Sequence, residues 1–363
     1  MSIKLLNKIH GCIAASWAGS SMGAVTEGLS LAQIEEKYGV LKEFVPYVRE
    51  GKHFRRPGGP YYDYYTDERE PGMTEDGIER QKLITLTIRD KNGRITVDDY
   101  AKGFLKYIRT EYFGHLTEPT DEIFYGMLKG GVPPASVGLF SWWPGLGAIA
   151  RSIHPVGIIN ACNPEQAARD ARDVARLVQP AHGLGWDYPA AVAAGIAEAL
   201  RPNATVESVV NAATSVCIRS EVRDSIIEDI ALAEGKKDIW ELRDALQKRY
   251  GTHDHRLGHV LVGTAFAIFV FTKGNAKEAI IAGTNTGIDT DCVSAVAAGL
   301  CGALNGTKDL PQDWIATMDL AAKNNQKTVS NFTTMETAEI LYNVLMKITE
   351  STKKQLSEVE TQL

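Results

Sequence analysis

Apolar residues recur at helical spacing along most of this chain, and many apolar segments are rich in alanine and glycine. After a first helix at the N-terminus, the segments that best fit helices are residues 188–200, 205–216, 238–250, 260–271, 292–304 and 337–349. Small side chains let neighbouring helices approach closely, because the distance between helix axes depends on the residues at the contact. The pattern therefore predicts an all-α protein.

Two local signals define helix ends. Asn163-Pro164 reads as a helix start, with an N-cap, a proline in the first turn and Gln166 as a capping-box glutamine. Asn92-Gly93 lies within an alternating segment that is typical of a β-hairpin. The arm after Gly93 is short, however, and Thr96 resembles a helix cap, so we interpret Asn92-Gly93 as a turn between two helices.

Two stretches show no helical pattern. Residues 49–73 are dense in Gly, Pro and Tyr, and residues 128–147 are dense in Gly, Pro and Trp. Loops of this length inside a compact domain are usually functional or disordered, and their aromatic content favours function. No repeat or flexible linker is visible. We therefore predict a single domain over residues 1–363, with a core at about 8–306, C-terminal helices to about 350 and a polar tail.

Composition and charge narrow the classes of partner. The hydrophobic fraction of 44% and the charged fraction of 23% are ordinary for a folded protein. A net charge of −6 argues against a nucleic-acid-binding protein and against an anionic membrane partner. The longest apolar run, residues 260–271, is shorter than the roughly 20 residues that a membrane-spanning helix needs. Five cysteines without a CxxC pair indicate reduced thiols, so we predict a cytoplasmic protein.

Acidic residues gather at three points where a helix begins or ends. They are Glu27, the run Thr74-Glu75-Asp76, and the pair Asp289 and Asp291. Each could simply cap a helix or complement its dipole. Alternatively, they could form a metal site, since such oxygen ligands without a Cys/His array favour Mg²⁺, Mn²⁺ or Ca²⁺ over zinc. Sequence spacing does not show whether the three points meet.

Five segments together resemble the ADP-ribosylglycohydrolase family, over about residues 8–306. The segment from Gly19 to Glu27 is similar to its G-D-x-x-G-x-x-x-E motif, and the segment from Thr74 to Gly77 to its T-D-D-T motif. Residues 145–157 resemble its G-N-G-A-x-M-R segment, with Ala181-His182 similar to a Ser/Thr-His pair. The segment from Asn285 to Cys292 resembles its N-x-G-G-D-x-D-T motif, which precedes a helix of small residues.

The resemblance implies an orthogonal helical bundle with a central cleft that holds one or two divalent ions, Mg²⁺ or Mn²⁺. In the family these ions hold the ribose diol of an ADP-ribosyl group while water attacks the anomeric carbon. The metal ligands carried over by position are Thr74, Glu75, Asp76, Asp289 and Asp291. The catalytic residues are Glu27, near the attacking water, with Asp76 and Asp289. A metal can orient substrate and acidify bound water, and a carboxylate can act as the base.

Substrate contacts are predicted from the same motifs and, for Trp142, from the aromatic loop before residue 145. The predicted residues are Trp142, Gly145, Gly147, His182, Asn285 and Gly287. Trp142 could stack on an adenine or could pack within its loop. His182 could contact a phosphate or the leaving group, or could be a hydrogen-bonded structural histidine.

Several departures from the family pattern fall within the predicted site. Glu75 is one methylene longer than the expected aspartate, and Gly77 and Cys292 stand where the family has threonine. Ser20 and Ile288 depart as well, and the spacing from Arg151 to Gly157 is one residue longer than expected. Sulfur is a poor ligand for Mg²⁺. Because four carboxylates remain, metal binding survives these changes better than a second ion does.

The leading hypothesis is a metal-dependent hydrolase that cleaves an N- or O-glycosidic bond of an ADP-ribosyl or related ribosyl substrate. Its partner would be an ADP-ribosylated protein or a small ADP-ribosyl or ribosyl compound, with no nucleic acid and no membrane. The alternative is a noncatalytic ADP-ribose-binding or structural protein on the same scaffold. A third hypothesis is an all-α phosphohydrolase that uses the same carboxylates.

Overall fold

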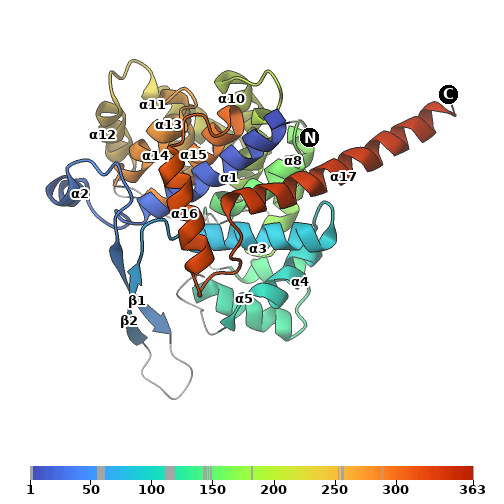
Figure 1. The fold of residues 1–363 in the computed structure, drawn as a ribbon, viewed down its shortest axis with the longest axis horizontal. Helices are drawn as coiled ribbons and strands as arrows, with labels where there is room; N and C mark the ends of the chain where they lie inside the picture. Colours follow the sequence, from blue (N-terminus) through green and yellow to red (C-terminus); the bar gives the residue numbers. More distant parts are fainter. Residues whose placement is uncertain are drawn as a thin grey trace.

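The computed structural model confirms an all-α fold that carries a single described β-hairpin (Figure 1). It describes residues 3–54, 62–110, 119–141, 145, 147, 149–180, 183–251, 253–254, 257–287 and 289–362. The described helices bury a continuous apolar core whose bulky members include Trp17, Tyr100 and Phe266.

Two helices far apart in sequence lie against each other at the centre of the fold: α1 (Ile3–Gly23) and α15 (Thr290–Asn305). Their backbones touch at glycines. A Cβ atom added at Gly19 would lie 2.5 Å from the carbonyl carbon of Ser294, and one added at Gly23 would lie 2.3 Å from the carbonyl oxygen of Thr290. No real Cβ atom tolerates such distances, so the helix pair depends on these glycines.

Helices from the second half of the chain surround this pair (Figure 1). α15 packs on α9 (Asp187–Ala199), α13 (Gly258–Phe271) and α14 (Ala276–Thr284). The outer helices on this side are α8 (Pro164–Ala175), which precedes α9, and α10 (Val206–Ser215), α11 (Ser220–Ala233) and α12 (Ile239–Tyr250). The predicted helices within residues 188–304 are thus confirmed, while α11 and α14 were not predicted.

Helices from the N-terminal half form another side of the molecule. α3 (Asp76–Lys91), α4 (Val97–Tyr107) and α5 (Pro119–Lys129) follow one another (Figure 1). The predicted loop 128–147 includes the short α6 (Pro134–Val137) and the 3-10 turn η2 (Gly138–Phe140). A further turn, η3 (Ala150–Ser152), leads into α7 (His154–Ile159), and η4 (Leu184–Trp186) leads into α9.

The predicted helix ends are confirmed. Asn92 ends α3 in the left-handed conformation at φ 57°, and Thr96 forms a capping box with Asp99 at the start of α4, so Asn92-Gly93 is a helix–helix turn. Asn163 caps α8 by accepting a hydrogen bond from the Gln166 amide N–H. The Gln166 side chain instead donates to Asp170, so only half of the predicted capping box forms.

A β-hairpin occupies most of the stretch at residues 49–73. Strand β1 (Tyr47–Phe54) pairs antiparallel with β2 (Tyr62–Arg69), and Tyr47 faces Arg69 at the base of the ribbon. The ribbon extends away from the helices (Figure 1). Helix α2 (Leu31–Tyr38) precedes it and begins with a capping box between Ser30 and Gln33.

The C-terminal part contains α16 (Gln312–Asn324) and the long α17 (Thr334–Glu360). The residues after about 350, predicted as a polar tail, continue α17 as an exposed helix that projects from the molecule (Figure 1). Among the described residues, no helix is both long and apolar enough to cross a membrane.

The contact between α1 and α15 yields a stability prediction. We expect Gly19→Ala to lower the free energy of unfolding by about 1–3 kcal/mol, because the added methyl group must push two helix backbones apart. Gly126→Ala is the matched control, since a Cβ atom at Gly126 in α5 meets open space. That change should be neutral or should stabilise by up to about 1 kcal/mol through helix propensity. Denaturant unfolding measures both, and equal effects would contradict the backbone contact.

Candidate metal centre

The centre is built around the N-terminus of α15. Asp289 occupies the N-cap position, but its carboxylate makes no capping hydrogen bond, and Asp291 lies in the first turn. Both side chains are buried. One ligand atom from each of Asp289, Asp291 and Cys292 lies within 4.8 Å of the other two. The capping alternative therefore does not account for the Asp289 carboxylate.

Both carboxylates are harder to ionise than an exposed aspartate. Burial raises the pKa of Asp289 to about 6, and burial followed by the charge of Asp289 raises the pKa of Asp291 well above its usual value. Within the described part of the chain, no cation forms an ion pair with either group. The Oδ1 atom of Asp291 is buried without a hydrogen-bond partner there. Two close buried carboxylates need a shared proton or a cation.

The ends of α1 and α14 fix the position of this pair. Thr290 donates a hydrogen bond through Oγ1 to the Gly23 carbonyl at 2.9 Å. Thr26, in the turn after α1, donates to the Thr284 carbonyl at 2.6 Å. Glu27 follows in the same turn, is exposed, and contributes to the raised pKa of Asp289 through its negative charge. The turn that carries Glu27 is therefore held against the segments on either side of Asp289.

The second acidic point joins them through an arginine. Asp76 begins α3, and its Oδ2 lies 2.5 Å from Nη2 of Arg151. Nη1 of Arg151 donates to the sulfur of Cys292 at 2.9 Å. The negative charge of Asp76 also contributes to the raised pKa of Asp291. All three acidic points thus belong to one cluster.

Glu75 has partners from the hairpin. Its Oε1 accepts a hydrogen bond from the Tyr47 hydroxyl and lies 3.4 Å from Nη2 of Arg69. Arg69 also donates to the carbonyl of Thr74 at 2.6 Å. Glu75 is almost fully buried, so these contacts provide the compensation that a buried carboxylate requires.

Thr74 connects the cluster to a second buried network. Its hydroxyl lies 3.4 Å from Oε1 of Glu79 and 3.4 Å from Nζ of Lys82. Lys82 forms an ion pair with Glu79 at 2.8 Å and lies over the ring of Trp17. The Thr74 hydroxyl is thus shared with a structural charge pair, and its role as a metal ligand stays a prediction.

A cavity of about 840 Å³ opens beside the cluster. Glu27 and Glu75 line it, together with Lys37, Tyr38 and Tyr47. Its walls come from the turn after α1, from the end of α2 and from the start of β1. The acidic cluster therefore borders a space large enough for a small-molecule ligand.

The described part of the chain contains four of the six predicted substrate residues. Trp142 and His182 lie outside the described residues. Gly145 accepts a hydrogen bond from the Gly258 amide at 2.7 Å, and a Cβ atom at Gly147 would lie 2.9 Å from the Leu261 side chain. These glycines fit the segment before η3 against α13, and their substrate contact stays a prediction.

Asn285 and Gly287 also have structural roles. The Asn285 amide accepts a hydrogen bond from the Leu41 backbone N–H at 3.0 Å and donates to the carbonyls of Leu41 and Ile281 at 2.9 and 2.8 Å. Gly287 has φ +68°, and a Cβ atom there would lie 2.5 Å from Leu31. Both residues attach the segment before α15 to α2 and to the residues that follow α2, and their substrate contact likewise stays a prediction.

Sequence reasoning missed three partners of the cluster: Tyr47, Arg69 and Arg151. Arg151 stands at the arginine of the matched G-N-G-A-x-M-R segment, which was the available signal for it, and it lies close to Gly77. A Cβ atom at Gly77 would lie only 3.0 Å from Cδ of Arg151. No comparable signal identifies Tyr47 and Arg69, because the hairpin was not predicted.

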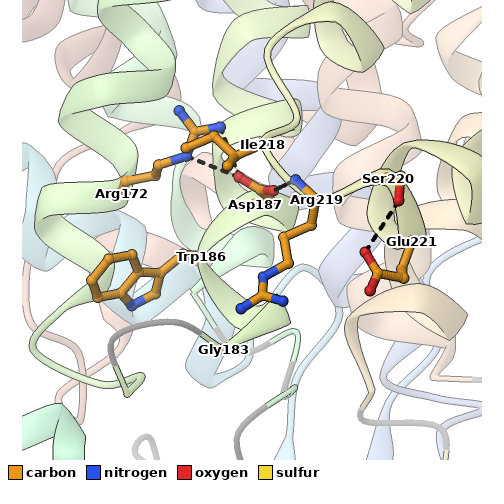
Figure 2. A pocket seen from close by; sticks show the side chains of 8 residues that line it. All are labelled: Arg172, Gly183, Trp186, Asp187, Ile218, Arg219, Ser220 and Glu221. Atoms are coloured by element: carbon orange, nitrogen blue, oxygen red, sulfur yellow. Dashed lines mark hydrogen bonds and ion pairs between the residues drawn. The ribbon is translucent and has the colours of Figure 1, made fainter.

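A second cavity, of about 430 Å³, lies between η4 and the start of α11 (Figure 2). Asp187 organises one wall by accepting hydrogen bonds from the Arg172 guanidinium, at 2.9 and 2.7 Å, and from the Arg219 amide at 2.6 Å. The other lining residues drawn there are Gly183, Trp186, the exposed Ile218, Ser220 and Glu221. The cluster of carboxylates does not line this cavity.

The donor set fits a hard divalent cation at the Asp289–Asp291 pair. Carboxylate oxygens suit Mg²⁺ and Mn²⁺, and the Oδ1 atom of Asp291 lacks any other partner among the described residues. The sulfur of Cys292 fits such an ion poorly. The residues therefore fit one ion well.

Comparisons with known proteins bear on the chain as a whole. The family model for ADP-ribosylglycohydrolases matches residues 1–346. A solved structure described as an "ADP-ribosylglycohydrolase-related protein complex" has a TM-score of 0.65 with this chain at 17% sequence identity. The match covers 94% of this chain and 99% of that one, which shows the same fold. No sequence among the curated proteins matches the chain.

The raised pKa of Asp289 predicts how the stability of the metal-free protein depends on pH. The folded-state pKa of about 6 exceeds the ordinary value of 3.8, so the folded protein holds this proton more tightly than the unfolded chain does. The contribution of Asp289 to the free energy of unfolding therefore falls as pH rises from about 4 to about 6 and stays low above. We expect Asp289→Asn to gain about 1–3 kcal/mol over the wild type at pH 7.5 and to lose this gain near pH 4.

Denaturant unfolding in the presence of a chelator measures this difference across the pH range. Asp313→Asn, which alters an exposed carboxylate at the start of α16, is the control and should show no such trend. A gain for Asp289→Asn that did not vary with pH would contradict the assigned titration.

Proposed function

Because the chain belongs to the ADP-ribosylglycohydrolase family, we propose that it is a metal-dependent hydrolase of an ADP-ribosyl or related ribosyl substrate, which cleaves an N- or O-glycosidic bond. The observation that carries this proposal is the buried Asp289–Asp291 pair, which has no ion-pair partner among the described residues and borders a cluster of further carboxylates. A structural role alone gives no reason to bury two adjacent like charges.

Asp289 and Asp291 are the residues that we propose to hold the cation, Mg²⁺ or Mn²⁺. The other predicted ligands, Thr74, Glu75 and Asp76, belong to the neighbouring part of the cluster. When bound, such an ion would orient the ribose hydroxyls and lower the pKa of a bound water.

Glu27 is the proposed general base. Its carboxylate is exposed on the wall of the 840 Å³ cavity and lies close enough to Asp289 to affect its titration. A water molecule would attack the anomeric carbon and form a new C–O bond while its proton passes to Glu27. The bond from that carbon to the nitrogen or oxygen of the leaving group would break, and the leaving group would take up a proton.

The proposed substrate is an ADP-ribosylated protein or a small ADP-ribosyl or ribosyl compound. The open cavity beside Glu27 and Glu75 supports a ligand larger than a lone sugar. All five cysteines are free, which supports a reducing compartment such as the cytoplasm.

A noncatalytic ADP-ribose-binding or structural protein on the same scaffold is the second candidate. One observation favours this candidate. Cys292 stands where the family pattern has a threonine, whose oxygen could bind a hard metal ion, and its sulfur instead accepts a hydrogen bond from Arg151. Affinity for ADP-ribose without any turnover would support this candidate.

The first test is activity. We expect the purified protein with Mn²⁺ to release ADP-ribose or ribose from a panel of ADP-ribosyl-arginine, ADP-ribosyl-serine and α-ribosides, detected by chromatography. Asp289→Ala should reduce kcat/KM by at least about 100-fold, since metal assistance is worth several kcal/mol. Asp313→Ala should have no effect. Absence of product from the whole panel would refute the proposed hydrolase.

The second test separates the base from the metal ligands. We expect Glu27→Gln to lower kcat by about 10²–10⁴-fold, because the water loses its proton acceptor. The rise in melting temperature caused by Mn²⁺ should stay unchanged in this variant, whereas Asp289→Ala should abolish it. If Glu27→Gln removed the Mn²⁺ effect as well, Glu27 would be a ligand instead of a base.

A further inference from the structure

We propose that His253 and His259 form a second metal site, at which two imidazole nitrogens bind a divalent transition ion such as Ni²⁺, Cu²⁺ or Zn²⁺. The site lies outside the acidic cluster, because His253 follows α12 and His259 is in the first turn of α13. Its donors are nitrogens instead of carboxylate oxygens, so it selects a different class of ion from the pair Asp289 and Asp291. The inference does not depend on the proposed hydrolase.

The two rings face each other through their nitrogens. Nε2 of His259 lies 3.2 Å from Nδ1 of His253, and the ring centroids are 5.4 Å apart. Without an ion, one of these nitrogens donates its proton to the other, since a neutral imidazole has one donor and one acceptor nitrogen. A shift of that proton to the second nitrogen of its own ring leaves two lone pairs between the rings, where a cation can bind.

The separation of the nitrogens fits a bidentate site. Bonds from a transition ion to imidazole are about 2.0–2.1 Å long, so two of them reaching nitrogens 3.2 Å apart meet at the ion at an angle of about 100°. This angle lies between those of octahedral and tetrahedral complexes. Rotation of the two rings about their side-chain bonds would turn both lone pairs toward an ion at that point.

Tyr250 helps to hold the pair in place. Its ring centroid lies 5.5 Å from that of His253 and 5.7 Å from that of His259. Its hydroxyl donates to Oδ2 of Asp229 at 2.6 Å, so the tyrosine is itself attached to α11. The three rings form a small cluster that restricts the orientations of the imidazoles. Ligands that are already ordered lose less entropy when the ion binds.

The surrounding charges favour the neutral imidazole, which is the form that binds metals. Burial, followed by the charges of His253 and Arg249, lowers the pKa of His259. Arg249 is itself compensated, because its Nη2 lies 2.6 Å from Oε2 of Glu228 and its Nε lies 2.9 Å from Oδ1 of Asp229. His253 is exposed and His259 is half-buried, so an ion can enter from solvent.

Water would complete the coordination of the ion. Among the described residues, no third His, Cys, Asp or Glu ligand atom joins the two imidazoles in one group. The ion would therefore keep open positions, unlike a structural zinc. It would also link the segment after α12 to α13, whose Gly258 amide donates to the Gly145 carbonyl at 2.7 Å. Binding should thus stabilise the folded chain.

Nickel titration tests the site. We expect calorimetric titration of the untagged, chelator-treated protein with Ni²⁺, in buffer that contains Mg²⁺, to show binding that His259→Ala weakens by at least about 10-fold. Even changes outside the ligand shell typically cost about 10–100-fold in affinity. His253→Ala should have the same effect. His10→Gln, which alters a buried histidine of α1 that hydrogen-bonds Thr334, is the control and should keep the affinity of the wild type.

No Ni²⁺ binding, or binding that survives both alanine substitutions, would overturn the inference. Binding that is lost in Asp289→Ala but kept in both histidine variants would place the ion at the acidic cluster and would overturn it as well. If neither histidine variant folded, X-ray absorption by the Ni²⁺-loaded wild type would decide, because two imidazole ligands would uphold the site and oxygen ligands alone would overturn it. Ni²⁺ binding without release of sugar would refute the hydrolase alone.

Discussion

The direct backbone contact between α1 and α15 is the constraint on which the rest of the structure depends. Gly19 and Gly23 on α1 leave no space for side chains, so the carbonyl groups of α15 meet the first helix directly. The end of one helix and the beginning of the other are therefore fixed together by Thr290 and Gly23. This geometry brings the turn that carries Glu27 to the start of α15, although more than two-thirds of the chain separates Glu27 from Asp289.

Charge compensation then decides the details of the site. Each buried carboxylate that starts α3 has an arginine: Arg69 for Glu75 and Arg151 for Asp76. No arginine forms an ion pair with Asp289 or Asp291 among the described residues, and burial is the main cause of their raised pKa values. Within the described part of this cluster, the uncompensated negative charge thus lies at Asp289 and Asp291, which is where a cation gains most from binding.

Local signals predicted the helices well, because caps such as Thr96 and Asn163 act within a few residues. The acidic residues of the site were also identifiable, since their residue types and the family resemblance both indicate metal chemistry. Their partners were not, because Arg151 and Arg69 reach the cluster only through tertiary packing. The hairpin was missed for a related reason: its strands, rich in Tyr, Gly and charged residues, lack the clear apolar alternation that predicts a half-buried strand.

The pairing of Tyr47 with Arg69 at the base of the hairpin links the register of the two strands to the chemistry of the site. Both residues contact Glu75, so the carboxylate is compensated only when the two strands are in the correct register. A slip by one residue would turn these side chains to the opposite face of the ribbon. Glu75 therefore favours the correct register of the hairpin. A ribbon in the wrong register would leave the buried Glu75 carboxylate without its partners, and the folded protein would be less stable even without substrate.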